Sequence, residues 1–326
     1  MKLQILVPQY KETDEIIKPL LDSISIQQNV DFADVGVIIC NDGSDVRLSD
    51  ALLRDYPYKI EYHICEHGGV SATRNKCLDL ATADYVMFCD ADDMFFQACG
   101  LYLIFREIAN GGFDSLTSAF IEESRTPGEK REPIYINHNM DSTFVHGKVH
   151  RRNYLVDNNI RWDDALTIHE DSYFNCLCQR LGTDVKYCPT PFYLWKWRDE
   201  SVCRHDPKYI LKTYNNMLDS NTALVKQFLR RRREPDAMFF ATSMIYDAYF
   251  TMNKAEWLNQ ENQAYRAATE KRFKAYFEEF RDLFERIPQE EKARIIMGVK
   301  NRMFSEGLLM ETITFDDWIK HIQNIY

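Results

Sequence analysis

The 326-residue sequence has no hydrophobic run that approaches the ~20 residues needed to cross a bilayer. We also expect no signal peptide, because the N-terminus leads straight into a predicted strand at residues 3–8. These absences predict a cytoplasmic protein, which could act peripherally to a membrane-bound assembly.

No CxxC motif is present, although the chain contains nine cysteines. The number is odd, and residues such as Cys40, Cys89 and Cys188 lie in apolar segments. This distribution favours reduced thiols over a disulfide framework. Cys176 and Cys178 are two residues apart, which does not make a zinc motif by itself.

Positive charge is not in excess, since the net charge is -10. This balance disfavours a general nucleic-acid binder, although a local basic patch could still exist. The one basic run, Arg230 to Arg233, is best explained as the solvated end of a helix. The alternative is a docking site for an anionic acceptor.

The first hundred residues alternate between strand and helix patterns. The expected elements are strands at 3–8, 35–40, 58–64 and 84–90, and helices at 13–27 and 69–82. This order predicts an α/β fold with a mixed, mostly parallel sheet flanked by helices. In such sheets ligands bind beyond the carboxyl ends of the strands.

The pattern changes after about residue 205. A helix at 169–182 and a strand at 191–197 precede this point; beyond it glycine nearly vanishes and apolar residues recur at helical spacing. We therefore expect two domains, 1–205 and an all-helical 206–326. An apolar stripe along 273–287 favours an internal core, although these helices could also form a homo-oligomer contact.

Three carboxylates, Asp90, Asp92 and Asp93, follow the strand at 84–90. Like charges this close repel each other, and burial makes the repulsion worse. A bound Mg²⁺ or Mn²⁺ would remove the repulsion, because both ions prefer oxygen ligands. The alternative is a polar turn in which Asp93 caps the next helix.

Three other motifs lie where a ligand would bind. "CNDGSD" (40–45) is good turn chemistry, and "GGVSATRN" (68–75) starts a helix from which Arg74 could reach a ribose or phosphate. "HED" (169–171) places Asp171 at a helix start, where it is either a general base or an N-cap.

The segment "LWKWRDESVCRH" (194–205) could form a phosphate clamp. The clamp residues would be Lys196, Arg198, Ser201 and Arg204, and His205 could add a metal ligand. The alternative is a half-buried edge strand followed by a charged turn.

Taken in order, these motifs resemble the family 2 glycosyltransferases of the GT-A (Rossmann-like) fold over about the first 205 residues. The segments that carry the resemblance are "VPQYKE" (7–12), "NDGSD" (41–45), "GGVSATRN" (68–75), "YVMFCDADD" (85–93), "GKVHRRNYL" (147–155), "HEDSYF" (169–174) and "YLWKWRDES" (193–201). Some positions depart from the family pattern. His67 stands where asparagine is frequent, Cys77 and His169 where glycine is common, and Lys196 where arginine is frequent.

The resemblance implies a UDP-sugar donor site. The residues implied to bind the nucleotide sugar are Pro8, Tyr10, Glu12, Asp42, His67, Arg74, Asp90, Ala91, Lys196, Arg198 and Ser201. Within this set Pro8 and Tyr10 border the base, and Asp42 reads the uracil edge. The metal, Mn²⁺ or Mg²⁺, would be held by Asp92 and Asp90, with His205 as a further ligand.

The resemblance also implies an inverting transferase, in which Asp171, with Glu170 beside it, deprotonates an acceptor hydroxyl. The acceptor could be a growing glycan, a teichoic-acid-like polymer, a lipid-linked glycan, a protein or a modified nucleic acid. Two alternatives stay open: a non-catalytic sugar-nucleotide or glycan binder with a helical interaction platform, and a glycosyltransferase acting on modified DNA.

Overall fold

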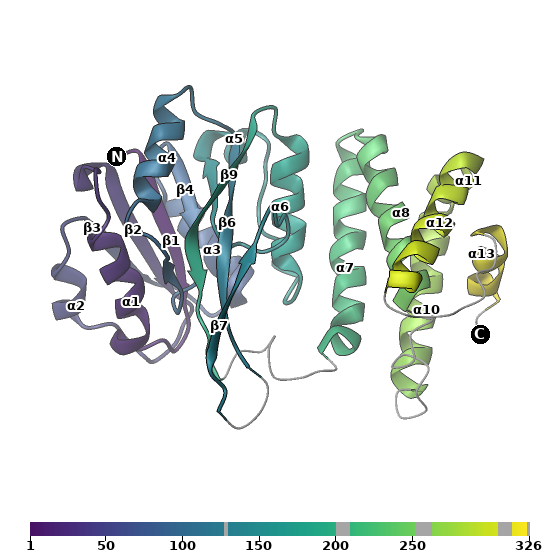
Figure 1. Cartoon of the computed structure of the whole chain (residues 1–326), viewed down its shortest axis with the longest axis horizontal. Helices are drawn as coiled ribbons and strands as arrows, with labels where there is room; N and C mark the ends of the chain where they lie inside the picture. Colours follow the sequence, from purple (N-terminus) through teal and green to yellow (C-terminus); the bar gives the residue numbers. More distant parts are fainter. Residues whose placement is uncertain (127–129, 200–208, 252–262, 306–314, 325–326) are drawn as a thin grey trace. The chain divides into compact units, whose positions relative to one another are not determined.

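The computed structural model describes residues 1–126, 130–199, 209–251, 263–305 and 315–324. The chain divides into two units, Met1–Ser201 and Val202–Tyr326. Figure 1 shows the strands in the first unit and helices throughout the second.

The first unit is built on one sheet with the strand order β3-β2-β1-β4-β8-β6-β9-β5, and β7 pairs with β6. Its strands are β1 (Leu3–Gln9), β2 (Val35–Asn41), β3 (Lys59–Ile64), β4 (Tyr85–Phe88), β5 (Met94–Phe95), β6 (Ser115–Arg125), β7 (Pro133–His138), β8 (Lys148–Arg151) and β9 (Val185–Trp195). β1 to β4 are parallel neighbours, and β6 runs parallel to β9. β8 runs antiparallel to both β4 and β6. The expected mixed, mostly parallel α/β sheet is confirmed.

Helices surround this sheet. They are α1 (Asp14–Ser25), the 3₁₀ helix η1 (Phe32–Asp34), α2 (Asp50–Arg54), α3 (Gly69–Leu80), α4 (Gly100–Ala109), α5 (Arg152–Asp157) and α6 (Glu170–Leu181). β2 and β4 are buried along their whole length, as expected for strands covered on both faces.

The register of the sheet brings the N-terminal motifs together. Pro8 pairs with Cys40 and Gln9 with Asn41, so that the ends of β1 and β2 lie side by side. The hydrogen bond from Asp42 N to Gln9 O (2.8 Å) continues this pairing past the strand ends. The segment that follows β4, beginning at Asp90, leaves the sheet at the same edge because β4 is the other neighbour of β1.

A short connection, residues 139–147, enters β8 through Gly147. This glycine has φ +65, and a Cβ atom there would overlap the side chain of Ser118. The left-handed conformation and the close approach both require glycine. The turn fixes how residues 141–146 lie relative to β8.

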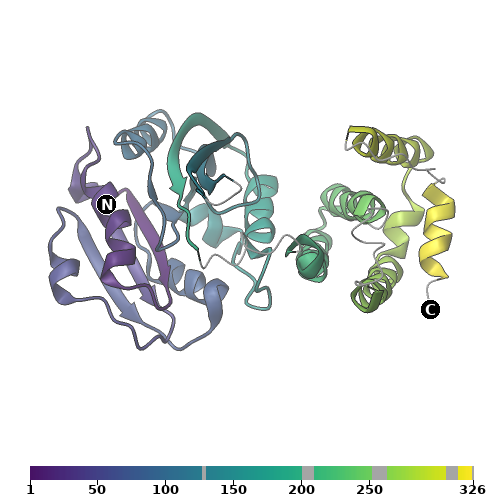
Figure 2. The ribbon, with the colours of Figure 1, turned by 60° about the horizontal axis from the view of Figure 1, so that its bottom comes forward.

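The second unit is helical in its described residues, as Figure 2 also shows. Its helices are α7 (Tyr209–Arg230), α8 (Glu234–Thr251), α10 (Gln263–Glu279), α11 (Arg281–Glu285), α12 (Gln289–Ser305) and α13 (Phe315–Gln323). The expected helical C-terminal region is confirmed. The apolar stripe between Phe273 and Ile287 is buried within the chain, which agrees with an internal core. Among the described residues, no helix combines the length and hydrophobicity that a membrane crossing requires.

Candidate active site

A pocket of about 370 Å³ opens at the edge of the sheet where β1, β2 and β4 end. Its lining residues are Pro8, Gln9, Tyr10, Glu12, Asp42, His67, Gly69, Val70, Thr73, Arg74, Asp90, Ala91 and Asp92. The structure therefore brings together the N-terminal residues that the sequence assigned to a nucleotide sugar. The lining also includes Gln9, Val70 and Thr73, which no motif had indicated as site residues.

Asp42 joins the second strand to the start of α3. Its carboxylate accepts hydrogen bonds from Gly68 N (2.8 Å) and Gly69 N (3.0 Å), and lies 2.9 Å from His67 Nδ1. A carboxylate at a helix N-terminus is stabilised by the helix dipole. Gly43 allows the approach, because a Cβ on it would lie 2.8 Å from His67 N.

An aromatic pair lies beside this turn. The rings of Tyr10 and His67 stack with their centroids 5.0 Å apart, and 43% of Tyr10 is exposed. Glu12 Oε2 accepts a hydrogen bond from Tyr10 N (2.6 Å), which holds the turn after β1. A planar nucleobase can stack on such a partly exposed aromatic pair.

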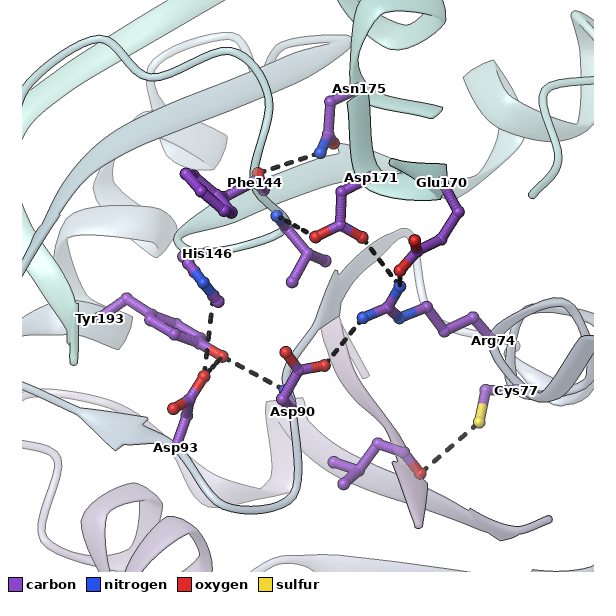
Figure 3. A network of polar contacts seen from close by, with 12 residues as sticks. Arg74, Cys77, Asp90, Asp93, Phe144, His146, Glu170, Asp171, Asn175 and Tyr193 are labelled. Atoms are coloured by element: carbon purple, nitrogen blue, oxygen red, sulfur yellow. Dashed lines mark hydrogen bonds and ion pairs between the residues drawn. The ribbon is translucent and has the colours of Figure 1, made fainter. Parts of the chain in front are cut away.

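Arg74 is the centre of the polar network in Figure 3. Its side chain is 3% exposed; Nη2 donates to Asp90 Oδ1 (2.9 Å), and Nη1 donates to Glu170 Oε1 (3.0 Å) and Asp171 Oδ1 (2.8 Å). The guanidinium also packs on Trp162, 4.4 Å from the ring centroid. One guanidinium thus links Asp90 of the pocket to both carboxylates at the start of α6.

Asp171 lies at the second position of α6 and does not cap the helix. Its Oδ1 binds Arg74, and its Oδ2 accepts a hydrogen bond from Val145 N (3.2 Å). The N-cap residue of α6 is His169, whose φ angle is 63°. Burial raises the pKa of Asp171 to about 8, although Arg74 acts in the opposite direction. A carboxylate whose pKa is near the working pH suits general-base chemistry.

Two cationic residues follow β9. Arg198 Nη1 lies 3.0 Å from Asp92 Oδ2 and 3.6 Å from Glu12 Oε1, which brings it against two residues of the pocket. Lys196 donates its backbone N–H to Asp93 Oδ1 (2.9 Å). The expected clamp residues Ser201 and Arg204 and the expected metal ligand His205 lie outside the described residues.

Asp93 differs from the two aspartates before it, and it does not cap a helix. Its side chain is 1% exposed, and Oδ2 accepts a hydrogen bond from the Tyr193 hydroxyl (2.6 Å). Burial and the neighbouring Asp92 and Asp90 raise the pKa of Asp93. The sequence pattern grouped the three acids, but their environments separate them.

Two overlapping sets of side chains in this region offer ligands that suit a divalent cation. Asp90 and Asp92 offer oxygen ligands at the pocket, as Mg²⁺ and Mn²⁺ prefer. Asp90, Asp93 and His146 each offer one ligand atom, and these atoms all lie within 4.8 Å of one another. His146 Nδ1 is buried without a hydrogen-bond partner, 3.7 Å from Asp93 Oδ2. Burial lowers the pKa of His146 to about 3, so its imidazole is neutral, the form that binds metals.

Comparison with known proteins gives the class of the chain. Residues 4–164 match the sequence profile described as "Glycosyl transferase family 2". The chain is 24% identical over 228 residues to the "Uncharacterized glycosyltransferase YibD" of Escherichia coli (strain K12), covering 62% of this chain and 63% of that protein. It is 38% identical over 96 residues to the "Teichoic acid poly(glycerol phosphate) polymerase" of Staphylococcus epidermidis, covering 28% of this chain and 13% of that protein.

A solved structure shows the same fold. "S. aureus TarS 1-349 in complex with UDP-GlcNAc" matches with a TM-score of 0.64 and 15% identity, covering 95% of this chain and 93% of that one. Residues 4–164 therefore carry a family 2 glycosyltransferase domain, and the fold is of the GT-A type. The aligned segments span less than two thirds of each of the two curated relatives.

Proposed function

We propose that the protein is an inverting, metal-dependent glycosyltransferase that moves a sugar from a UDP-sugar to an acceptor hydroxyl. The observation that carries this proposal is the bridge made by Arg74. It holds Asp90 of the nucleotide pocket and Asp171 of α6 on one guanidinium, at 2.9 and 2.8 Å. A donor site and a base must lie within one substrate length of each other for a single displacement.

The pocket supplies the donor site in this proposal. The Tyr10–His67 stack borders the base next to Pro8, and Asp42 faces its uracil edge from the turn after β2. The diphosphate lies toward Asp90 and Asp92, within reach of Arg198 and Lys196, and Ser201 is assigned to it by the family resemblance. When bound, a divalent ion supplies positive charge to the diphosphate.

Asp171 acts as the general base. It removes the proton from the acceptor hydroxyl, whose oxygen attacks the anomeric carbon from the face opposite the diphosphate. The new C–O bond forms as the bond to the diphosphate breaks, and the electron pair leaves with UDP. Arg74 and the Val145 amide keep the Asp171 carboxylate oriented during this step, and Glu170 shares Arg74 with it.

For the acceptor we propose a hydroxyl of a cell-surface polymer. The support comes from the names of similar proteins, a teichoic acid poly(glycerol phosphate) polymerase and a "Minor teichoic acid biosynthesis protein GgaB". The cysteines in the described parts of the chain are free thiols, which supports the predicted cytoplasmic location.

The test is release of UDP from a panel of UDP-glucose, UDP-galactose, UDP-N-acetylglucosamine and UDP-N-acetylgalactosamine with Mn²⁺. One donor should be turned over and should also raise the melting temperature by mass action. Binding of a UDP-sugar without any turnover, tested with polyol-phosphate and glycan acceptors, would instead support a non-catalytic binder.

Removing the metal should abolish the activity. With excess EDTA we expect UDP release to fall to background, because the charge of the diphosphate leaving group is no longer offset. Adding Mn²⁺ beyond the chelator should restore it. Full turnover in EDTA would show that the ion has no part in the reaction.

A further inference from the structure

Lys148, the first residue of β8, carries an ammonium group inside the protein. Its side chain is 1% exposed, and its nearest carboxylate, Asp141, is 4.0 Å away. Lys148 pairs with Thr117 of β6, and the next residue, Val149, pairs with Met87 of β4, so the backbone of Lys148 is held in the sheet. A buried charge is costly unless it is paired or hydrogen-bonded.

The ammonium instead binds the loop that precedes β8. Lys148 Nζ donates to Phe144 O and to His146 O, the latter at 3.5 Å. The carbonyls it binds are those of the residues on either side of Val145. Lys148 therefore fixes the backbone around the amide of Val145.

Asn175 restrains the same loop from the side of α6. Its Nδ2 donates to Thr143 O (2.9 Å) and Phe144 O (3.0 Å), and the side chain is buried. Asn175 lies four residues after Asp171, so the two side chains project from one face of the helix. Figure 3 shows Asn175 and Asp171 both directed at the segment that contains Phe144.

These contacts converge on Asp171, since the restrained Val145 N–H donates to its Oδ2 at 3.2 Å. The other oxygen is held by Arg74. We infer that Lys148 and Asn175 are positioning residues, which hold the Val145 amide where it orients the carboxylate of Asp171. This inference rests on the proposed role of Asp171 as the base. It adds to that role the groups that align the base.

The test begins with Lys148→Met, which keeps the length of the side chain and removes its donors. Turnover of the best UDP-sugar should fall about 10- to 100-fold, the cost of a misplaced reacting group. Affinity for UDP with Mn²⁺, measured by calorimetry, should stay within about twofold, because no pocket residue changes. Asn175→Leu should likewise lower turnover and leave UDP affinity unchanged. If Lys148→Met no longer binds UDP, Asn175→Leu alone tests the inference.

A double variant separates positioning from a general structural effect. In an Asp171→Asn background, adding Lys148→Met should cause little further loss of kcat, because residues that act as a unit are not additive. The same loss in both backgrounds would overturn the inference, and so would unchanged kcat in the single variants. Lys186→Met is the matched control, since Lys186 lies on β9 and pairs with Glu107; its kcat should equal that of the wild type.

Hydrogen exchange tests the restraint without using activity. The amides of residues 141–147 should exchange faster in Lys148→Met and Asn175→Leu than in the wild type or Lys186→Met. Unchanged exchange would contradict the restraint, even if the enzyme is active. A wild type that releases no UDP from any donor would refute the proposed function, whatever the exchange result.

Discussion

Replacing Asp171 with asparagine should lower kcat at least ~100-fold, the contribution typical of a general base. The asparagine can still occupy the space between Arg74 and the Val145 amide but cannot take a proton. UDP binding with Mn²⁺ should be retained, because Asp171 does not line the nucleotide pocket. The measurement is steady-state UDP release together with calorimetric UDP affinity.

The pH dependence gives a second view of the same residue. Burial raises the pKa of Asp171 to about 8, and only the ionised form can act as a base. In the wild type kcat/KM should therefore rise with pH up to about 8, and this limb should be missing in Asp171→Asn. Asp79→Asn, at an exposed carboxylate paired with Arg161, should leave the profile unchanged. Near-normal turnover of Asp171→Asn would remove this residue from the mechanism.

Replacing Arg74 with methionine should lower the free energy of unfolding by roughly 3–5 kcal/mol, the cost of leaving buried charges without their partner. The guanidinium is 3% exposed and is shared by Asp90, Glu170 and Asp171. Its loss leaves three carboxylates close together with no cation among them. Urea unfolding of the two proteins measures the difference.

The loss of stability caused by Arg74→Met should depend on pH. Arg74 opposes the rise in the pKa of Asp171 that burial causes, so its removal raises that pKa further. A carboxyl whose pKa is raised in the folded state favours folding below its unfolded pKa, and this stability is lost as pH rises through the folded value. Folded wild type loses the Asp171 proton only near pH 8, so the deficit of Arg74→Met should be larger at about pH 9 than at about pH 6.

The control is Arg161→Met, which removes an exposed pair with Asp79. We expect it to cost less than about 1 kcal/mol, as exposed salt bridges usually do. Equal costs for the two variants at pH 8 would show that the network around Arg74 contributes nothing special to stability.

The first half of the sheet could be predicted from local sequence. β1, β2 and β4 are continuous apolar runs that end at turn residues, so their limits and their common edge follow from the pattern. The parallel pairing of β6 with β9 could not, because it joins segments about seventy residues apart through side-chain packing that has no local signature.

The sequence indicated several residues that lie close together in the structure, but it did not indicate their contacts. The order of the motifs indicated Asp42, Arg74, Asp90 and Asp171. In the structure the first three line one pocket, and Arg74 binds Asp171. No local pattern indicated that the terminal nitrogens of Arg74 would bind three carboxylates. Roles carried by backbone groups, such as the Val145 amide, leave no residue-type signal at all. Lys148 lay inside a recognised motif, but only its burial shows what it binds.

The most direct test of the account is a crystal structure of the protein with UDP and Mn²⁺, with the anomalous signal of manganese recorded. We expect the base beside Tyr10 and Asp42, the diphosphate toward Arg198, and the manganese peak against Asp92 and Asp90. Nucleotide bound elsewhere, or an empty pocket at saturating UDP, would contradict the proposed donor site. A manganese peak at Asp93 and His146 would contradict the assignment of the ion to Asp92.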